Sequence, residues 1–153
     1  MKPKLLVSAC LLGTPCRYDG KSKKNEAVCA LAERFELIPV CPEVLGGLPT
    51  PRTPSERRGA CVVRKDGRDV TAEYRRGAEC ALEPARREGV LAAVLKERSP
   101  SCGSGEIYDG TFTGALTAGD GVTAELLKSN GITVYGEGEQ SLTEFLCSVS
   151  HST

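Results

Sequence analysis

The sequence is poor in the residues on which many enzyme mechanisms and binding surfaces depend. Its 153 residues include one histidine, no tryptophan and 5% aromatic residues. The histidine, His151, stands at the extreme C-terminus, where chain ends commonly fray. Catalytic triads and metal sites that need an ordered imidazole are therefore excluded. The scarcity of aromatic side chains also argues against a platform on which nucleic-acid bases stack.

Charge and hydropathy remove further classes. Lys plus Arg equals Asp plus Glu at 20 each, so no overall field attracts nucleic acid or an acidic membrane surface. No run approaches the roughly 18 apolar residues of a membrane span, and the N-terminal segment lacks the features of a signal peptide. We expect a soluble, cytoplasmic protein whose partner is a small molecule, with neither nucleic acid nor a membrane involved.

Short apolar runs and helical stripes alternate along the chain. This alternation predicts a single α/β domain over residues 1–153, with three layers and a mainly parallel, Rossmann-like sheet covered by helices. Residues 148–153 are expected to form a flexible tail. The expected strands are 4–9, 36–40, 90–96 and 132–136, and the expected helices are 23–35, 71–88, 122–131 and 141–149.

Two stretches between these elements are rich in turn residues. Segment 46–60 contains many Gly, Pro and Arg residues and is long for a loop in a compact domain, which predicts a lid or a mobile segment. The stretch 60–71 is expected to form a hairpin, with Asp66-Gly67 at its turn.

The sequence is rich in cysteine, with eight in all. In a reducing compartment such a number indicates metal binding, redox chemistry or burial, because disulfides rarely persist there. Cys10 and Cys41 directly follow predicted strands, and Cys102 lies in the loop after a third. Since ligands collect beyond the carboxyl ends of parallel strands, we expect these three thiols to meet at one edge of the sheet.

The other five cysteines follow different patterns. Four of them stand beside apolar residues and are expected to be small buried hydrophobes, namely Cys29, Cys61, Cys80 and Cys147. Cys16 shares the first loop with Cys10, and three roles remain open for it: an extra metal ligand, a resolving thiol, or a residue packed beneath the site.

Three thiolates without histidine favour a soft centre, either zinc or an iron–sulfur cluster. No Cys-x-x-Cys pair is present, which weakens zinc-ribbon and thioredoxin-like interpretations. A cubane cluster on three protein thiolates keeps one iron open, as a catalytic metal site does, whereas a fourth thiol would close it. Pro42 suits the first position of a helix, so we expect Cys41 to cap that helix with its thiolate at the positive end of the dipole.

Several short motifs, taken in order, resemble the thiouracil desulfurase family of iron–sulfur desulfidases, formerly a domain of unknown function. The resemblance spans about residues 4–147, and the combination is specific although each motif is short. The motifs are "SACLLG", "CRYDG", "CPE", "LKERSPSCG", "IYDGTFTG", "GDGVTAELL" and "GI".

The resemblance implies a cofactor and a set of ligands. Members of this family carry an oxygen-sensitive [4Fe–4S] cluster on three cysteines and remove sulfur from 2-thiouracil without net redox change. The resemblance implies that the cluster ligands here are Cys10, Cys41 and Cys102. From the residues alone, zinc remains the alternative metal. The resemblance further implies an acid residue beside the cluster, which falls on Glu43 of "CPE". Taken alone, Glu43 is typical of a first-turn carboxylate stabilised by the helix dipole.

The implied activity is desulfuration of a thiolated heterocycle such as 2-thiouracil, with release of sulfide. The cluster would act as a Lewis acid, and Glu43 would take the proton of the attacking water. Ser101 is the candidate catalytic hydroxyl, with Ser99 and Arg17 as candidate substrate contacts, although serines beside Pro and Gly are usually turn residues. The alternatives are a sulfur transferase, and a zinc- or cluster-binding structural or sensing module without turnover.

Overall fold

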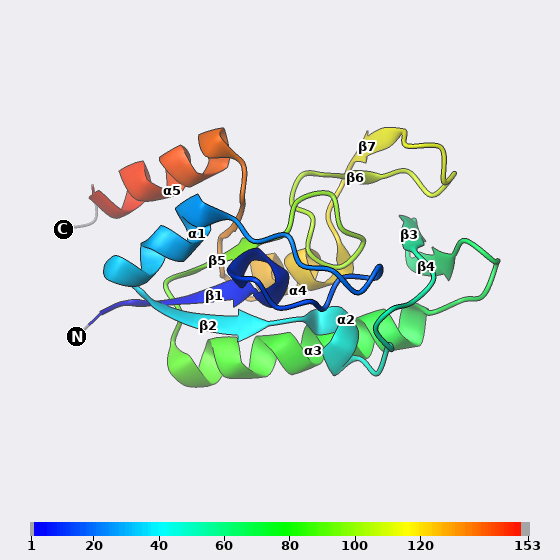
Figure 1. The fold of residues 1–153 in the computed structure, drawn as a ribbon, viewed down its shortest axis with the longest axis horizontal. Coiled ribbons are helices and arrows are strands. Elements are labelled where there is room, and N and C mark those ends of the chain that lie inside the picture. Colours follow the sequence, from blue (N-terminus) through cyan, green and yellow to red (C-terminus); the bar gives the residue numbers. More distant parts are fainter. Residues whose placement is uncertain (1, 151–153) are drawn as a thin grey trace.

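The computed structural model describes residues 2–150, and a four-stranded parallel sheet lies at its centre (Figure 1). The strands stand in the order β2-β1-β5-β8, so the chain winds to one side of β1 first and then to the other. Ligands of open parallel sheets bind beyond the carboxyl ends of the strands at such a reversal. The strands are β1 (Lys4–Ser8), β2 (Glu36–Val40), β5 (Ala92–Leu95) and β8 (Val134–Gly136).

Helices cover both faces of this sheet. In Figure 1, α1 and α5 lie over one face and α3 and α4 over the other. The predicted three-layer α/β fold with a parallel sheet is confirmed. The α-helices are α1 (Glu26–Ala30), α2 (Pro42–Leu45), α3 (Thr71–Glu88), α4 (Val122–Ser129) and α5 (Glu139–Ser150), and two 3₁₀ turns are η1 (Ala9–Leu12) and η2 (Leu31–Glu33).

Alternate residues of the inner strands supply the two halves of the core. Leu5 and Val7 of β1 join the apolar cluster under α1 and α5, whereas Leu6 joins the cluster under α3 and α4. All four residues of β5 are buried, as expected of an inner parallel strand. Each fully buried leucine or valine contributes roughly 1.5–3 kcal/mol, so the two clusters fix the strands and therefore the positions of their ends.

Two antiparallel hairpins stand beyond the carboxyl ends of the strands, on the right of Figure 1. They are formed by β3 (Ser55–Arg58) with β4 (Cys61–Arg64), and by β6 (Glu106–Tyr108) with β7 (Leu116–Ala118). Segment 46–60 is not one continuous loop, because β3 occupies Ser55–Arg58, and its role as a lid or mobile segment stays a prediction. The expected turn at Asp66-Gly67 is present, with Gly67 at φ +94°, but β4 pairs mainly with β3.

Helix α1 is shorter than the predicted helix 23–35. Asn25 caps it, since its side chain accepts a hydrogen bond from the Val28 N–H at 3.0 Å. The backbone N–H groups of Lys23 and Asn25 donate instead to the carbonyls of Cys10 and Leu11. Residues 23–25 therefore brace the loop of Cys10 rather than extend the helix.

The last helix is longer than predicted. Helix α5 continues through Ser150, because Leu146 and Val149 pack against the core. Residues 148–150 of the predicted flexible tail thus belong to α5, while 151–153, including His151, lie outside the described residues. Within residues 2–150, no helix combines the length and apolar character needed to cross a membrane.

Candidate functional site

The carboxyl ends of β1, β2 and β5 bring thiols of three loops to one cavity of about 700 Å³. Cys10 follows β1, Cys41 follows β2, and Cys102 stands in the loop after β5. Cys10 and Cys102 are buried and Cys41 is half-buried. The predicted convergence of these three residues is what the structure has, and it follows from the shared direction of the strands.

Cys10 is held by the turn that begins directly after β1. Its carbonyl accepts hydrogen bonds from the N–H of Gly13 at 3.3 Å and of Lys23 at 2.9 Å. Gly13 has φ +104°, a conformation that side chains rarely adopt, so it closes the turn η1. The bond from Lys23 ties the Cys10 backbone to a segment thirteen residues further along the chain, which limits where the thiol can move.

Cys41 caps the short helix α2, and Pro42 opens that helix as expected. The helix sits directly on α3 because two glycines allow the backbones to touch. A Cβ at Gly77 would come within 1.9 Å of the Pro42 carbonyl oxygen, and one at Gly46 within 2.0 Å of the Glu73 carbonyl oxygen. This contact fixes the height of Cys41 and Glu43 above the sheet.

Cys102 is placed by the hydroxyl of Ser99 and the first turn of α4. Ser99 Oγ accepts hydrogen bonds from the N–H of Ser101 at 3.0 Å and of Cys102 at 3.1 Å. The N–H groups at the start of α4 donate to the carbonyls of Pro100 and Ser101. A Cβ at Gly121 would meet the Ser101 carbonyl carbon at 2.4 Å, so only glycine permits this approach.

Cys16 is the fourth thiol of the cavity. It is buried and lies in hydrogen-bonding contact with Cys10 and Cys41, and Cys41 Sγ donates to the Cys16 carbonyl at 3.8 Å. Burial and closeness to the other thiols suit both an extra metal ligand and a residue packed beneath the site. The role of Cys16 therefore stays a prediction.

Two of the predicted ligands, Cys41 and Cys102, have thiols whose pKa is raised above the ordinary value. Burial, with a contribution from the charge of Glu43, raises the pKa of Cys102 to about 12. A hydrogen bond with Cys16 and burial raise the pKa of Cys41, and these effects outweigh the favourable N–H of Val44 in α2. The N-terminus of α2 favours the thiolate of Cys41, as expected, but Cys16 and burial outweigh it and raise the pKa of the thiol. Metal binding would have to displace these protons.

The spacing of the donors distinguishes between kinds of metal centre. Among the described residues, no group of three or more His, Cys, Asp or Glu side chains is placed to hold a single metal ion. A lone zinc ion needs all its sulfurs at about 2.3 Å, whereas a cubane cluster spreads its bonds over several iron atoms and suits more widely spaced thiols. Three thiols from three loops around one cavity fit the larger centre.

Glu43 lines the same cavity from the first turn of α2. Its Oε2 accepts a hydrogen bond from the Tyr74 hydroxyl at 2.5 Å and lies 3.5 Å from Nη2 of Arg52. The side chains of Glu43 and Arg52 are 19% and 6% exposed, so the ion pair is largely shielded from solvent. Glu43 is thus a held carboxylate beside the thiols rather than a solvated first-turn residue.

The remaining predicted site residues divide into two groups. Ser99 and Arg17 line the cavity, Arg17 near Asp19 at 4.0 Å. The Ser101 side chain does not: it is completely buried, and its hydroxyl shares a hydrogen bond of 2.7 Å with Thr123 in α4. It also lies near Cys102 Sγ, where it favours the thiolate. Its place suits support of Cys102 better than contact with a ligand.

Sequence reasoning missed Arg52 and Tyr74 at this site. Arg52 stands in the Pro-rich stretch after α2, and its Nη2 also donates to the Cys16 carbonyl at 3.1 Å. Tyr74 belongs to the apolar stripe of α3, which identifies it as a core residue and gives no sign of a hydroxyl partner. The missed signal was a tyrosine in that stripe, because a buried hydroxyl needs an acceptor.

The expectation that four cysteines are buried hydrophobes is wrong for three of them. Cys61, Cys80 and Cys147 are exposed, and Cys29 is half-buried, with its Sγ 3.7 Å from the Leu11 carbonyl. Cys80 lies on the outer side of α3, and Cys61 at the hairpin edge of β4. The expected helix or strand alone did not show whether each cysteine lies on the buried or the solvent-exposed face of that element.

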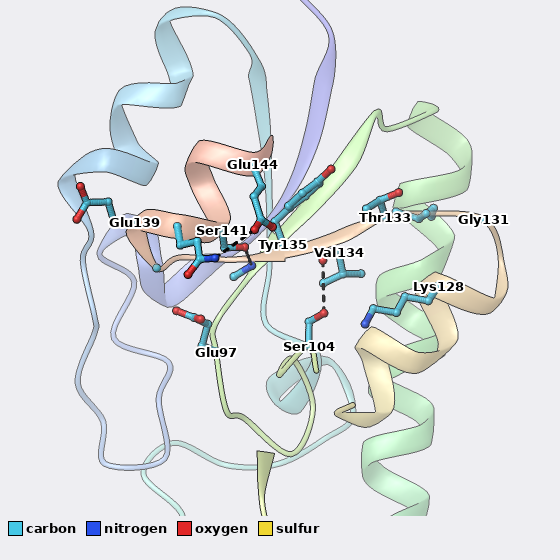
Figure 2. Close-up of a pocket in the computed structure, with 14 residues that line it drawn as sticks. Glu97, Ser104, Lys128, Gly131, Thr133, Val134, Tyr135, Glu139, Ser141 and Glu144 are labelled. Atoms are coloured by element: carbon cyan, nitrogen blue, oxygen red, sulfur yellow. Dashed lines mark hydrogen bonds between the residues drawn. The ribbon is translucent and has the colours of Figure 1, made fainter. Parts of the chain in front are cut away.

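A second cavity, of about 860 Å³, lies along the outer edge of β8 (Figure 2). Its lining includes Glu97, Ser104, Lys128 and Glu144 but none of the thiols. Figure 2 shows the Ser104 hydroxyl reaching toward Val134 of the edge strand, and the hydroxyl lies 3.4 Å from the Val134 carbonyl oxygen. Although larger, this cavity contains none of the thiols, so the thiol cavity is the candidate functional site.

Comparison with known proteins identifies the family. The chain matches the family model described as 2-thiouracil desulfurase over residues 5–139. It is 44% identical over 145 residues to the Bacillus subtilis (strain 168) protein named "Uncharacterized protein YbbK", covering 88% of this chain and 96% of that protein. It also matches the solved structure of a protein named "[4Fe-4S]-dependent thiouracil desulfidase TudS", with TM-score 0.90 and 51% identity over 97% of this chain and 99% of that one. The chain therefore belongs to the 2-thiouracil desulfurase family.

Proposed function

We propose that this protein is a [4Fe–4S]-dependent desulfurase that removes sulfur from 2-thiouracil or a related thiolated heterocycle. The observation that carries the proposal is the convergence of Cys10, Cys41 and Cys102 on one cavity in a chain of this family. The relative with 51% identity bears the name of a [4Fe-4S]-dependent thiouracil desulfidase, which supports both the cofactor and the substrate class.

The three thiols would hold the cluster, which when bound supplies a Lewis-acidic iron with an open coordination position. The net reaction exchanges sulfur for oxygen: C=S and water give C=O and hydrogen sulfide. A bond from the water oxygen to the carbon forms, the carbon–sulfur bond breaks, and the two protons of water leave with the sulfide. No electron is transferred, so neither an oxidant nor a reductant is required.

Glu43 is the residue placed to remove a proton from the attacking water. It is the carboxylate that lines the cavity from the turn directly after Cys41, and its Oε2 is already occupied by Tyr74 and Arg52. A general base must lie within hydrogen-bond reach of the proton that it removes. A ligand bound in this cavity would bring that proton within reach of Glu43. The proton then passes to the departing sulfide.

Ser99 is the hydroxyl best placed to orient the substrate ring. Its oxygen accepts two backbone N–H groups, so its own proton is directed away from them, and the residue lines the cavity. Arg17 lines the same cavity and supplies donors for a carbonyl oxygen of the substrate. Ser101, the hydroxyl first predicted to be catalytic, is assigned to the support of Cys102 through its bond with Thr123.

A substitution of Cys16 distinguishes the proposed enzyme from a structural or sensing module without turnover. A fourth thiolate would close the open iron, so the proposal requires that the cluster survive the Cys16→Ser substitution with full iron content and turnover. Loss of the cluster in Cys16→Ser would favour a closed, non-catalytic site. A sulfur transferase is distinguished by its products, because hydrolysis needs no acceptor other than water.

The proposal is tested with protein reconstituted under anaerobic conditions and supplied with 2-thiouracil. We expect the thiouracil absorbance to fall while uracil and sulfide appear in equal amounts. Glu43→Gln keeps the size of the side chain but removes the base, and general-base catalysis is worth roughly 10²–10⁴-fold in rate. Glu106→Gln, an exposed glutamate of β6, is the matched control and should match the wild type. Full activity of Glu43→Gln would remove Glu43 from this role.

A further inference from the structure

A buried tyrosine that does not line the cavity contacts the proposed base, Glu43. Tyr74 projects from α3 and is 2% exposed, with its ring packed among Val62 and Val70 and the partly buried Leu48 and Val122. This packing fixes the ring, so the position of its hydroxyl is fixed as well. The hydroxyl donates to Glu43 Oε2 at 2.5 Å.

We propose that Tyr74, assisted by Arg52, is a positioning residue for desulfuration that acts through Glu43. The inference rests on the proposed function, since it assumes that Glu43 takes the proton of the attacking water. It adds two residues from outside the family motifs, one in the first turn of α3 and one in the segment before β3.

The Tyr74 hydroxyl is a permanent donor at neutral pH. Burial, together with the charge of Glu43, raises the pKa of Tyr74 far above its ordinary value. The phenol therefore keeps its proton, and its hydrogen bond to the carboxylate does not switch during turnover. Such a bond to a charged acceptor is short and strongly directional.

Arg52 contacts the same carboxylate oxygen from the segment that precedes β3. Its Nη2 lies 3.5 Å from Glu43 Oε2 and donates to the Cys16 carbonyl, while Nη1 donates to the Pro49 carbonyl at 3.1 Å. The guanidinium is thus anchored on two backbone carbonyls and acts as a fixed charge rather than a mobile one.

The proposed role of Tyr74 and Arg52 follows from the carboxylate oxygen of Glu43 that both residues contact. Both contacts fall on Oε2, so Oε1 is the oxygen left to take a proton from a ligand in the cavity. A carboxylate held in one plane needs no reorientation before it acts, which is the advantage of a pre-arranged catalytic group. Without Tyr74, Glu43 would rotate about its side-chain bonds and present Oε1 only part of the time.

Tyr74→Phe tests this inference, because it removes one hydroxyl and leaves the packed ring. We expect kcat for 2-thiouracil to fall by roughly 10- to 100-fold, as for one hydrogen bond to a charged group, while KM stays within about twofold. Iron content and the thermal midpoint should stay close to those of the wild type. Tyr135→Phe is the matched control, since it removes a hydroxyl that contacts Ser148 at 3.3 Å, away from this cavity.

A double-mutant cycle separates action through Glu43 from a merely structural role. If Tyr74 acts through Glu43, adding Tyr74→Phe to Glu43→Gln lowers kcat no further, because the group being positioned is already gone. An equal fold-loss in both backgrounds, or a Tyr74→Phe enzyme with unchanged kcat, would overturn the inference. Full activity of Glu43→Gln itself would overturn the proposed base, and this inference with it.

Arg52 gives a second route if Tyr74→Phe folds poorly. Arg52→Lys keeps the charge beside Oε2, and Arg52→Gln removes it. We expect Arg52→Lys to keep a kcat at least several-fold above that of Arg52→Gln, with similar KM values and with the difference abolished in the Glu43→Gln background. Equal kcat values for the two variants, or a difference that persists without Glu43, would count against the inference.

Discussion

The sheet and the two hairpins beyond it are held together by different forces. The sheet is buried between two apolar clusters, and residues such as Leu6 and Val94 are completely inaccessible to solvent. The hairpins are joined by directed polar bonds instead: Glu56 accepts the N–H groups of Gly110 and Phe112 at 2.9 and 3.1 Å, and Arg58 Nε donates to the Gly110 carbonyl at 2.7 Å.

This difference assigns separate tasks to the two regions. Apolar packing fixes the strand ends, and with them the backbones of Cys10, Cys41 and Cys102. The hairpins supply further cavity walls, including Ser55, Glu56 and Tyr108. Breaking polar bonds of this kind locally costs less free energy than unfolding the core. The hairpin walls are therefore the region where the cavity can open without loss of the fold.

The largest effect is expected from the sheet. Leu6→Ala leaves a cavity between β1 and the helices α3 and α4 and should lower the free energy of unfolding by roughly 3–5 kcal/mol. Urea unfolding of the protein without cluster measures this directly. A change below about 1 kcal/mol would mean that the sheet is not held by apolar burial, and the contrast with the hairpins would disappear.

A smaller effect is expected where α2 rests on α3. Alanine normally stabilises a helix relative to glycine. At this position, however, Gly77→Ala places a methyl group against the Pro42 carbonyl. We expect a loss of about 1–3 kcal/mol in the free energy of unfolding, together with a drop in iron content because Cys41 moves with α2. Cys80→Ala, at an exposed position of the same helix, serves as the control. A stabilised Gly77→Ala protein with full iron content would show that α2 does not depend on this contact.

The smallest effect on global stability is expected in the hairpins. Glu56→Ala removes the two bonds to the β6–β7 turn, and we expect faster amide exchange at Gly110 and Phe112 with less than about 1 kcal/mol lost globally. Native-state hydrogen exchange checks this, with Glu106→Ala as the control for an exposed ion pair. If Glu56→Ala lowered global stability as much as Leu6→Ala, the hairpins and the sheet would form one cooperative unit.

The sequence predicted the sheet and its thiols because strong local patterns and a general rule agree there. Continuous apolar runs marked the strands, and parallel strands bring residues such as Cys10 and Cys102 to a common edge. The hairpin β6–β7 was missed because its strands have three residues each and Leu116–Ala118 is exposed throughout, which leaves no apolar alternation to detect.

The polar partners of the site were beyond local patterns. Glu43 and Tyr74 are 31 residues apart, and their contact exists only because Gly46 and Gly77 let α2 settle on α3. The two serines of the third loop illustrate the same limit. Spacing placed both Ser99 and Ser101 near Cys102, but only the fold tells that one lines the cavity and the other bonds to Thr123.

The most direct test measures iron and acid-labile sulfide after anaerobic reconstitution of single cysteine variants. Cys10→Ala, Cys41→Ala and Cys102→Ala should each lose the cluster and the turnover of 2-thiouracil, whereas Cys80→Ala, at an exposed position of α3, should match the wild type in both. Full iron and sulfide content in any one of the first three variants would contradict the claim that these thiols jointly hold the catalytic cluster.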